Sequence, residues 1–132
     1  MKVTKIADHA FAGKYSIKEN GVDVTKDRTD FIKIKKIVVP NSVTHIGKDA
    51  FGYNSNLEFV DIGNSVTTFA QGIIYNCPKI AAFTIPESVT TIGPYCFGYC
   101  KGIKSIFIPK TVTTVSYSQD FNTDNLVFYC EA

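Results

Sequence analysis

The sequence repeats one phrase four times at a constant spacing of 23 residues. In its clearest copy, residues 85–93, the phrase reads Ile-Pro-Glu-Ser-Val-Thr-Thr-Ile-Gly, and its central valine recurs as Val43, Val66, Val89 and Val112. A fixed period of about 20–50 residues is typical of stacked repeats, in which each repeat adds one coil to a solenoid. A chain of 132 residues then makes a single solenoid of about five coils.

Each repeat carries about six apolar positions at fixed offsets, more than one repeat can bury by itself. The stretch before its Pro or Gly alternates in polarity, which predicts a short strand with aliphatic side chains pointing inward. These strand segments are 34–39, 57–62, 80–85 and 103–108. The Val-Thr-x-Ile-Gly stretch that follows predicts a second extended segment on the opposite wall. We expect Gly47 and Gly93 to form turns there with positive φ.

The N-terminal residues 3–11 match residues 43–51 at an offset of 40, so they predict a further coil. The surplus of 17 residues lies in the polar stretch 14–30, where Asn20-Gly21 predicts an inserted hairpin with a type I′ turn. This insert is either a functional loop or a tolerated insertion on one face. Neither end of the chain shows a polar cap, so we expect 1–132 to be one solenoid cut from a longer array. Its open strand edges favour end-to-end self-association.

The formal net charge of +2 is too weak to indicate a nucleic-acid partner. Residues 1–48 hold ten Lys/Arg against five Asp/Glu, whereas residues 49–132 hold four against seven. This distribution predicts a charge gradient along the solenoid, or else only a locally biased solvated face. No apolar run is long enough to span a membrane, and the N-terminus lacks the apolar core of a signal peptide.

The composite repeat reads Leu-x-x-Ile-x-Ile-Pro-x-Ser-Val-Thr-x-Ile-Gly-x-x-Ala-Phe-x-x-Cys-x-x-Leu. It resembles the BspA-like (Treponema pallidum-type) leucine-rich repeats over the whole chain except residues 14–30. The resemblance implies a leucine-rich repeat solenoid of the α/β horseshoe class, strand-dominated and right-handed. Its parallel sheet is expected on the concave side, with short turns or 3-10 segments in place of long helices. The resemblance also implies a cell-surface or secreted protein with a role in adhesion and protein binding.

The four cysteines allow three interpretations. Cys77 and Cys100 stand at the repeat position that Asn54 holds one coil earlier, where a short polar side chain is expected to bond the backbone of the neighbouring coil. Cys96 takes the place of a small alanine, and Cys130 falls in the last strand. Because there is no Cys-x-x-Cys pair, buried free thiols are favoured over a disulfide or a metal or redox site.

The sequence carries no catalytic signature. His9 and His45 stand at different repeat positions, and neither has an acidic or serine partner in phase with it. Phosphate-binding loops and paired carboxylates are also absent from the sequence. We therefore expect a protein that is not an enzyme and that needs no cofactor or metal.

Two aromatic residues, Phe59 and Phe107, stand at strand positions predicted to face solvent. Large aromatics beside small residues are typical of interface anchors. The residues predicted to bind a protein, or a glycan, on the concave face are Phe59, Asp61, Thr84, Lys104 and Phe107. On the same face Lys35 is predicted to lie opposite Glu58. The alternatives are that the phenylalanines are covered by the parent protein or merely tolerated, and that the repeats form a spacer presenting a neighbouring domain.

Overall fold

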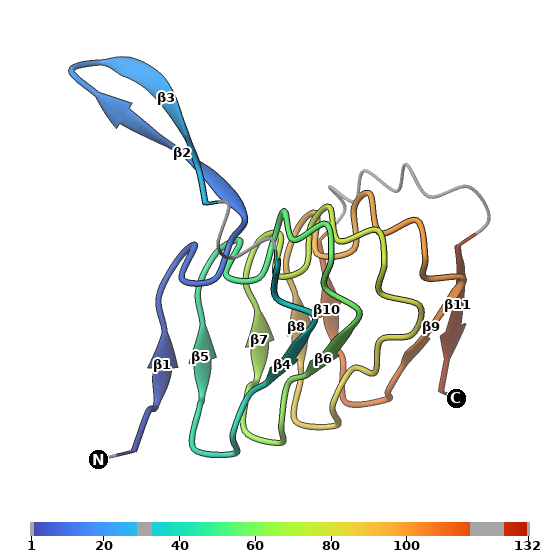
Figure 1. Cartoon of the computed structure of the whole chain (residues 1–132). Helices are drawn as coiled ribbons and strands as arrows, with labels where there is room; N and C mark the ends of the chain where they lie inside the picture. Colours follow the sequence, from blue (N-terminus) through green and yellow to red (C-terminus); the bar gives the residue numbers. More distant parts are fainter. Residues whose placement is uncertain (1, 29–32, 117–125, 132) are drawn as a thin grey trace.

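The chain winds into a strand-dominated solenoid, as the repeat predicts. The computed structural model describes residues 2–28, 33–116 and 126–131. These residues contain no α-helix and make about four turns, close to the predicted count. Each turn runs through two short extended segments on opposite walls, and successive turns stack from the N-terminus to the C-terminus (Figure 1).

One wall consists of the Val-Thr-x-Ile-Gly segments. Strands β7, β8 and β10 form a parallel sheet in the order β10-β8-β7, and β1 pairs with β5. In this register Phe69, Ile92 and Val115 stand side by side, each one period from the next. The strands are β1 (Lys5–Ile6), β5 (His45–Ile46), β7 (Thr68–Phe69), β8 (Thr91–Ile92) and β10 (Thr114–Val115). The predicted second wall is therefore confirmed.

The opposite wall carries the strands that precede each Pro or Gly, and we call it the strand face. It holds two parallel pairs, β4 with β6 and β9 with β11. The strands are β4 (Lys36–Val38), β6 (Phe59–Asp61), β9 (Ser105–Ile108) and β11 (Val127–Cys130). Residues 81–84, which lie between the two pairs in sequence, form no strand.

The predicted strand at residues 80–85 is thus missing, and two features of its sequence explain the gap. Ala81 and Ala82 have low strand propensity. Phe83 stands where the neighbouring coils carry Ile or Val, and its ring packs between Phe69 and Phe97 at centroid distances of 5.9 and 5.7 Å. The strand is therefore absent in the coil that combines two alanines with a larger ring at the inward position.

The core runs along the axis between the two walls. It is built from the apolar positions that recur in every coil. The fully buried large side chains are Phe51, Phe69, Phe97, Leu57, Ile62, Ile73, Ile74, Ile80, Ile92, Ile103, Ile106 and Val43. One predicted core position differs: Val115 in β10 is 49% exposed.

The two turn glycines have a different role from the predicted one. Neither Gly47 nor Gly93 has a positive φ, so that prediction is wrong. A Cβ atom on Gly93 would lie 2.6 Å from the carbonyl oxygen of Phe69, and one on Gly47 would strike the backbone of Asp8. Positive φ occurs further along the turn, in two columns: His9, Asp49, Gly72 and Tyr95, and then Tyr53, Asn76 and Tyr99. Gly47 and Gly93 are therefore glycines because the neighbouring coil packs too closely for a Cβ atom.

The segment for which the sequence predicts a hairpin is the antiparallel pair β2 (Lys14–Glu19) and β3 (Val22–Asp27). Its turn residues Asn20 and Gly21 have φ of 52° and 82°, as a type I′ turn requires. The hairpin projects from the turn side of the solenoid (Figure 1). At its base the Arg28 backbone N–H donates to the carbonyl of Gly13 at 2.8 Å, and the Arg28 guanidinium donates to the carbonyl of His9 at 2.8 Å.

Candidate functional site

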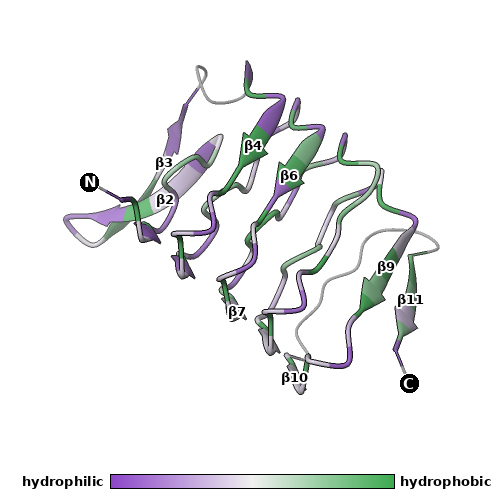
Figure 2. Ribbon diagram, turned by 90° about the horizontal axis from the view of Figure 1, so that it is seen from below, coloured by the Kyte–Doolittle hydropathy of each residue, from purple (hydrophilic) through white to green (hydrophobic). Residues whose placement is uncertain are grey.

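All five residues predicted to bind a partner are exposed on the strand face, which is seen from below in Figure 2. Phe59 in β6 is 46% exposed and Phe107 in β9 is 54% exposed. Period-2 alternation explains this, because their neighbours Val60 and Ile106 point into the core. Both phenylalanines therefore present large apolar surface on one wall, at some cost in hydration free energy.

The structure does not bring the two phenylalanines together in one cluster. Phe59 lies under the Lys36 ammonium, whose nitrogen is 5.2 Å from the ring centroid. Phe107 stands opposite Tyr129 of β11, which is 58% exposed. The segment 81–84 lies between them in sequence. The strand face thus carries two separate aromatic anchors.

The polar members of the predicted set make local contacts. The carboxylate of Asp61 accepts a hydrogen bond from the backbone N–H of Gly63 at 2.9 Å, and the Lys104 ammonium donates to the carbonyl of Lys101 at 3.0 Å. Lys35 and Glu58 are joined through the backbone, where Glu58 N–H donates to the Lys35 carbonyl at 2.8 Å. No ion pair between those two side chains is found in the described part of the chain.

Three of the four cysteines are buried and all four are free thiols. The Cys77 thiol donates to the carbonyl of Phe51 at 3.2 Å, and the Cys100 thiol donates to the carbonyl of Ile74 at 3.0 Å. Asn54 makes the equivalent bond, from Nδ2 to the carbonyl of Phe11 at 2.7 Å. The predicted side-chain ladder between coils is therefore present.

Burial also makes the core thiols unreactive. It raises the pKa of Cys96 to about 12 and that of Cys100 to about 11, and it raises the pKa of Cys77 strongly as well. Cys130 in β11 is exposed, which corrects the expectation of a buried thiol at that position. The described residues contain no group of three or more His, Cys, Asp or Glu side chains that could hold a metal ion.

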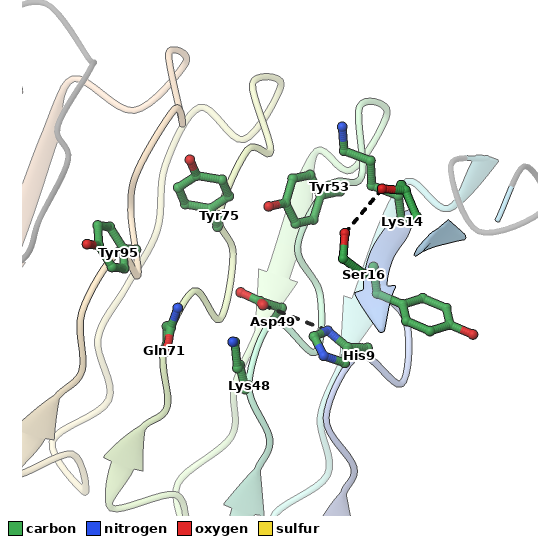
Figure 3. A pocket seen from close by; sticks show the side chains of 11 residues that line it. His9, Lys14, Ser16, Lys48, Asp49, Tyr53, Gln71, Tyr75 and Tyr95 are labelled. Atoms are coloured by element: carbon green, nitrogen blue, oxygen red, sulfur yellow. Dashed lines mark hydrogen bonds and ion pairs between the residues drawn. The ribbon is translucent and has the colours of Figure 1, made fainter. Parts of the chain in front are cut away.

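A second candidate site lies on the turn side, where sequence reasoning did not place one. A cleft of about 490 Å³ opens between the β2–β3 hairpin and the turns of the following coils (Figure 3). We call it the hairpin cleft. It is lined by His9, Lys14, Tyr15, Ser16 and Thr25 from the first coil and the hairpin, and by Lys48, Asp49, Tyr53, Gln71, Tyr75 and Tyr95 from later turns.

Asp49 is the central acidic group of this cleft. Its side chain is only 15% exposed, and its carboxylate lies 3.8 Å from Nδ1 of His9. Burial raises the pKa of Asp49, and the charge of Lys48 partly opposes that shift. Among the described residues no hydrogen bond to this carboxylate is found. A partly buried carboxylate without such a bond has unused acceptor capacity.

Besides Tyr15 of the hairpin, three tyrosines from later turns line the cleft. Tyr75 packs edge-on against Tyr53 and Tyr95, with centroid distances of 5.4 and 6.4 Å. The Lys14 ammonium lies 5.1 Å from the centroid of the Tyr53 ring. Burial raises the pKa of Tyr53, and the charge of Asp49 adds to the shift. In Figure 3, Asp49, Lys48 and Gln71 lie below Tyr53 and Tyr75.

The spacing of His9 and Asp49 in the sequence already indicates that the two residues are neighbours. His9 and Asp49 are separated by the same offset of 40 that relates residues 3–11 to 43–51. They therefore occupy one repeat position in consecutive coils, and the statement that His9 has no acidic partner in phase was wrong. The cleft itself was missed because the hairpin's direction is set by its base contacts, which repeat periodicity does not encode.

The stacked coils, the two walls and the ladder between turns define a leucine-rich repeat protein. The chain belongs to the BspA type leucine rich repeat family, whose model matches residues 29–129 in 6 copies. No curated protein matches the sequence. In the described residues, no helix is long and apolar enough to cross a bilayer.

Two crystal structures show a similar fold. One is a leucine rich cell surface protein from Faecalibacterium prausnitzii A2-165, with a TM-score of 0.78 and 23% identity over 98% of this chain. The other is the T. pallidum leucine rich repeat protein, with a TM-score of 0.70 and 20% identity over 86% of this chain. This chain spans 30% and 45% of those two chains, respectively.

Proposed function

We propose that the chain is a non-enzymatic, protein-binding module of a cell-surface or secreted protein, which recognises its partner through the strand face in an adhesive role. The observation that carries this proposal is the exposure of Phe59 and Phe107 on one wall, at 46% and 54%. Exposed aromatic anchors of this kind dominate the binding free energy of many protein interfaces. Asp61, Thr84 and Lys104 supply the polar contacts around them.

The family supports an interaction role, because solenoids of this class present long, regular surfaces to partners. The F. prausnitzii protein of similar fold is described as a cell surface protein, which supports the proposed location. The alternative function is a spacer that presents a neighbouring domain. In that case the exposed aromatics make no difference to binding.

The test is a capture experiment on a mixture of extracellular and surface proteins, with this chain as bait. A Phe59→Ala/Phe107→Ala variant is the test bait, and a Val22→Ala/Val115→Ala variant is the matched control. The control removes exposed apolar side chains that are 64% and 49% accessible but lie off the strand face. All baits are first compared by circular dichroism and thermal unfolding.

A partner held by the parent and the control, and bound at least about tenfold more weakly by the Phe59/Phe107 variant, supports the proposal. Equal binding of that partner by all three baits overturns recognition through the strand face. If no bait retains a specific partner, the spacer function is favoured.

A further inference from the structure

The hairpin cleft lies on the turn side, away from the strand face, and nothing in the proposed protein-binding function uses it. We propose that the hairpin cleft is a carbohydrate-binding site that takes one or two pyranose units. The cleft has the size of a small-ligand site, it combines aromatic rings with polar groups that make no hydrogen bond among the described residues, and its residues depart from the repeat.

The cleft has the size and lining of a small-ligand site. Its volume of about 490 Å³ falls within the range of about 300–1,000 Å³ found for ligand pockets. One side is formed by the hairpin, where the hydroxyls of Ser16 and Thr25 bond each other at 3.2 Å. The other side is formed by tyrosine side chains from consecutive turns of the solenoid. A ligand seated here contacts both the insert and the repeats.

The polar groups on the cleft floor suit vicinal hydroxyls. The carboxylate of Asp49 lies 3.8 Å from Nδ1 of His9 and near the charge of Lys48, but it accepts no hydrogen bond from the described residues. No hydrogen bond of the Gln71 amide or the Lys48 ammonium is found among those residues either. Together these groups offer acceptors and donors side by side. Adjacent hydroxyl groups of a sugar both donate and accept, so they pair with such a set better than a purely anionic or cationic ligand does.

The tyrosine rings can pack against the apolar face of a sugar ring. A pyranose ring carries an apolar patch of C–H groups, which packs against the ring of Tyr53, Tyr75 or Tyr95. A fully apolar ligand leaves the floor carboxylate desolvated and unpaired. A phosphate or sulfate group is disfavoured beside Asp49, and the described residues offer no metal-binding cluster.

The repeat does not require these side chains. Asp49 and Tyr95 occupy the position that is Gly72 in the coil between them, and all three have positive φ. A left-handed conformation is less favourable for a non-glycine residue, so glycine is the less strained choice there. Gly72 in turn leaves space for Asp49, because a Cβ atom on Gly72 would overlap the Asp49 carboxylate. Non-glycine residues held at positive φ beside a cleft are often found at functional sites.

The experiment uses the full chain with a single C-terminal biotin, displayed in four copies on streptavidin so that weak binding is measurable by multivalency. The probe is an array of defined oligosaccharides that end in galactose, glucose, mannose, fucose, N-acetylglucosamine or N-acetylneuraminic acid. The variants are Asp49→Asn, which keeps the shape and tolerates the left-handed φ, and Gln71→Ala. Glu58→Gln is the matched control, because it removes an exposed carboxylate from the strand face.

We expect the parent chain and Glu58→Gln to retain a subset of oligosaccharides that share one terminal sugar. We expect Asp49→Asn and Gln71→Ala each to lower the apparent affinity for them at least about tenfold. Retention of no oligosaccharide overturns the proposal, and so does equal binding by all four proteins. A parallel peptide array covers the other ligand class: peptides retained by the parent and lost in Asp49→Asn, with no sugar retained, assign the cleft to peptides instead.

Discussion

The thiol of Cys77 donates a hydrogen bond to the carbonyl of Phe51 in the preceding coil, with Sγ and O 3.2 Å apart. Asn54 has the same role one coil earlier, where its amide donates to the carbonyls of Phe11 and Phe51 at 2.7 and 2.8 Å. These side chains satisfy backbone carbonyls that the turn leaves unpaired inside the protein. The turn side of the solenoid is therefore held by side chains, in a column that tolerates both amide and thiol.

Replacing Asn54 tests this column. We expect Asn54→Ala to lower the free energy of unfolding by about 3 kcal/mol, because it leaves buried carbonyls unpaired and opens a cavity. Asn54→Cys should cost clearly less, since the thiol at the equivalent position of the next two coils makes the same bond. Urea unfolding of the three proteins measures both effects. Equal losses for alanine and cysteine would show that the hydrogen bond contributes little.

The cysteines should differ sharply in reactivity. In the native protein at pH 8 we expect a disulfide reagent to label Cys130 promptly, because it is the exposed thiol. The three buried thiols have pKa values raised by desolvation, so few of them are thiolates, and the reagent does not reach them. Denaturant should expose all four. A Cys130→Ser variant should show no prompt labelling, and any prompt labelling of that variant would mean that the core opens readily.

Glycines that pack coils together should be less replaceable than the glycine of the hairpin turn. Gly93→Ala places a Cβ atom 2.6 Å from the carbonyl oxygen of Phe69, so we expect a loss of about 3 kcal/mol in unfolding free energy. Gly21→Ala meets no atom within 4 Å and carries only the left-handed strain of about 1–2 kcal/mol. Urea titrations compare the two. A larger loss for Gly21→Ala would be inconsistent with the stacking of the coils.

The partly buried carboxylate of Asp49 should make stability depend on pH. Desolvation raises its pKa in the folded state above the ordinary value of 3.8, so the folded protein holds this proton more tightly than the unfolded chain. Ionisation of Asp49 therefore lowers the free energy of unfolding as the pH rises from 3.8 through the raised pKa of the folded state. The charges that face it belong to His9, Lys48 and Asp8.

We accordingly expect Asp49→Asn to raise the melting temperature at pH 7 and to have little effect at pH 3, where the carboxyl is protonated in both states. Glu58→Gln, whose carboxyl is exposed, is the control for removing a negative charge. Thermal unfolding at both pH values measures the difference. A lower melting temperature of Asp49→Asn at pH 7 would contradict the expected cost of this buried charge.

The β2–β3 hairpin should be removable without unfolding the solenoid. Lys14 and Asp27 face each other at its base, so an Asn-Gly turn can join them directly in place of residues 15–26. The bonds of Arg28 to Gly13 and His9 remain in that variant. We expect a change of a few degrees at most in melting temperature, together with loss of any ligand that needs the hairpin wall. Unfolding of the variant would show that the insert belongs to the core.

The repeat made most of the fold predictable, because its period fixes which side chains must be buried in every coil. Val43, Val66 and Val89 are fully buried as expected. The ladder of Asn54, Cys77 and Cys100 was predicted from their shared repeat position and from the short polar side chains that stand there. The missing strand at residues 81–84 was not predictable from the period. Residues 80–85 keep the spacing of the other coils, and they differ from them in the two alanines and in the larger Phe83 ring.

Of the two candidate sites, the strand face was predictable from the sequence and the hairpin cleft was not. Exposure of Phe59 and Phe107 follows from strand alternation, which is a local property of sequence. The hairpin cleft depends on how an insertion is anchored to the coils beside it, through Arg28 and Gly13. Contacts of that kind join residues with no periodic relation to each other.

The break in the strand face has a consequence for any partner seated there. In the described structure, residues 81–84 make no backbone hydrogen bond to the coils on either side. Ala81, Ala82 and Thr84 are exposed, so their amide and carbonyl groups can bond to water or to a bound ligand. Every amino acid except proline carries both groups. Ala81 and Ala82 are already alanine. Alanine substitution does not change these backbone groups, so it would not detect a partner that binds them. Replacing a backbone amide by an ester removes the N–H donor and would detect such binding.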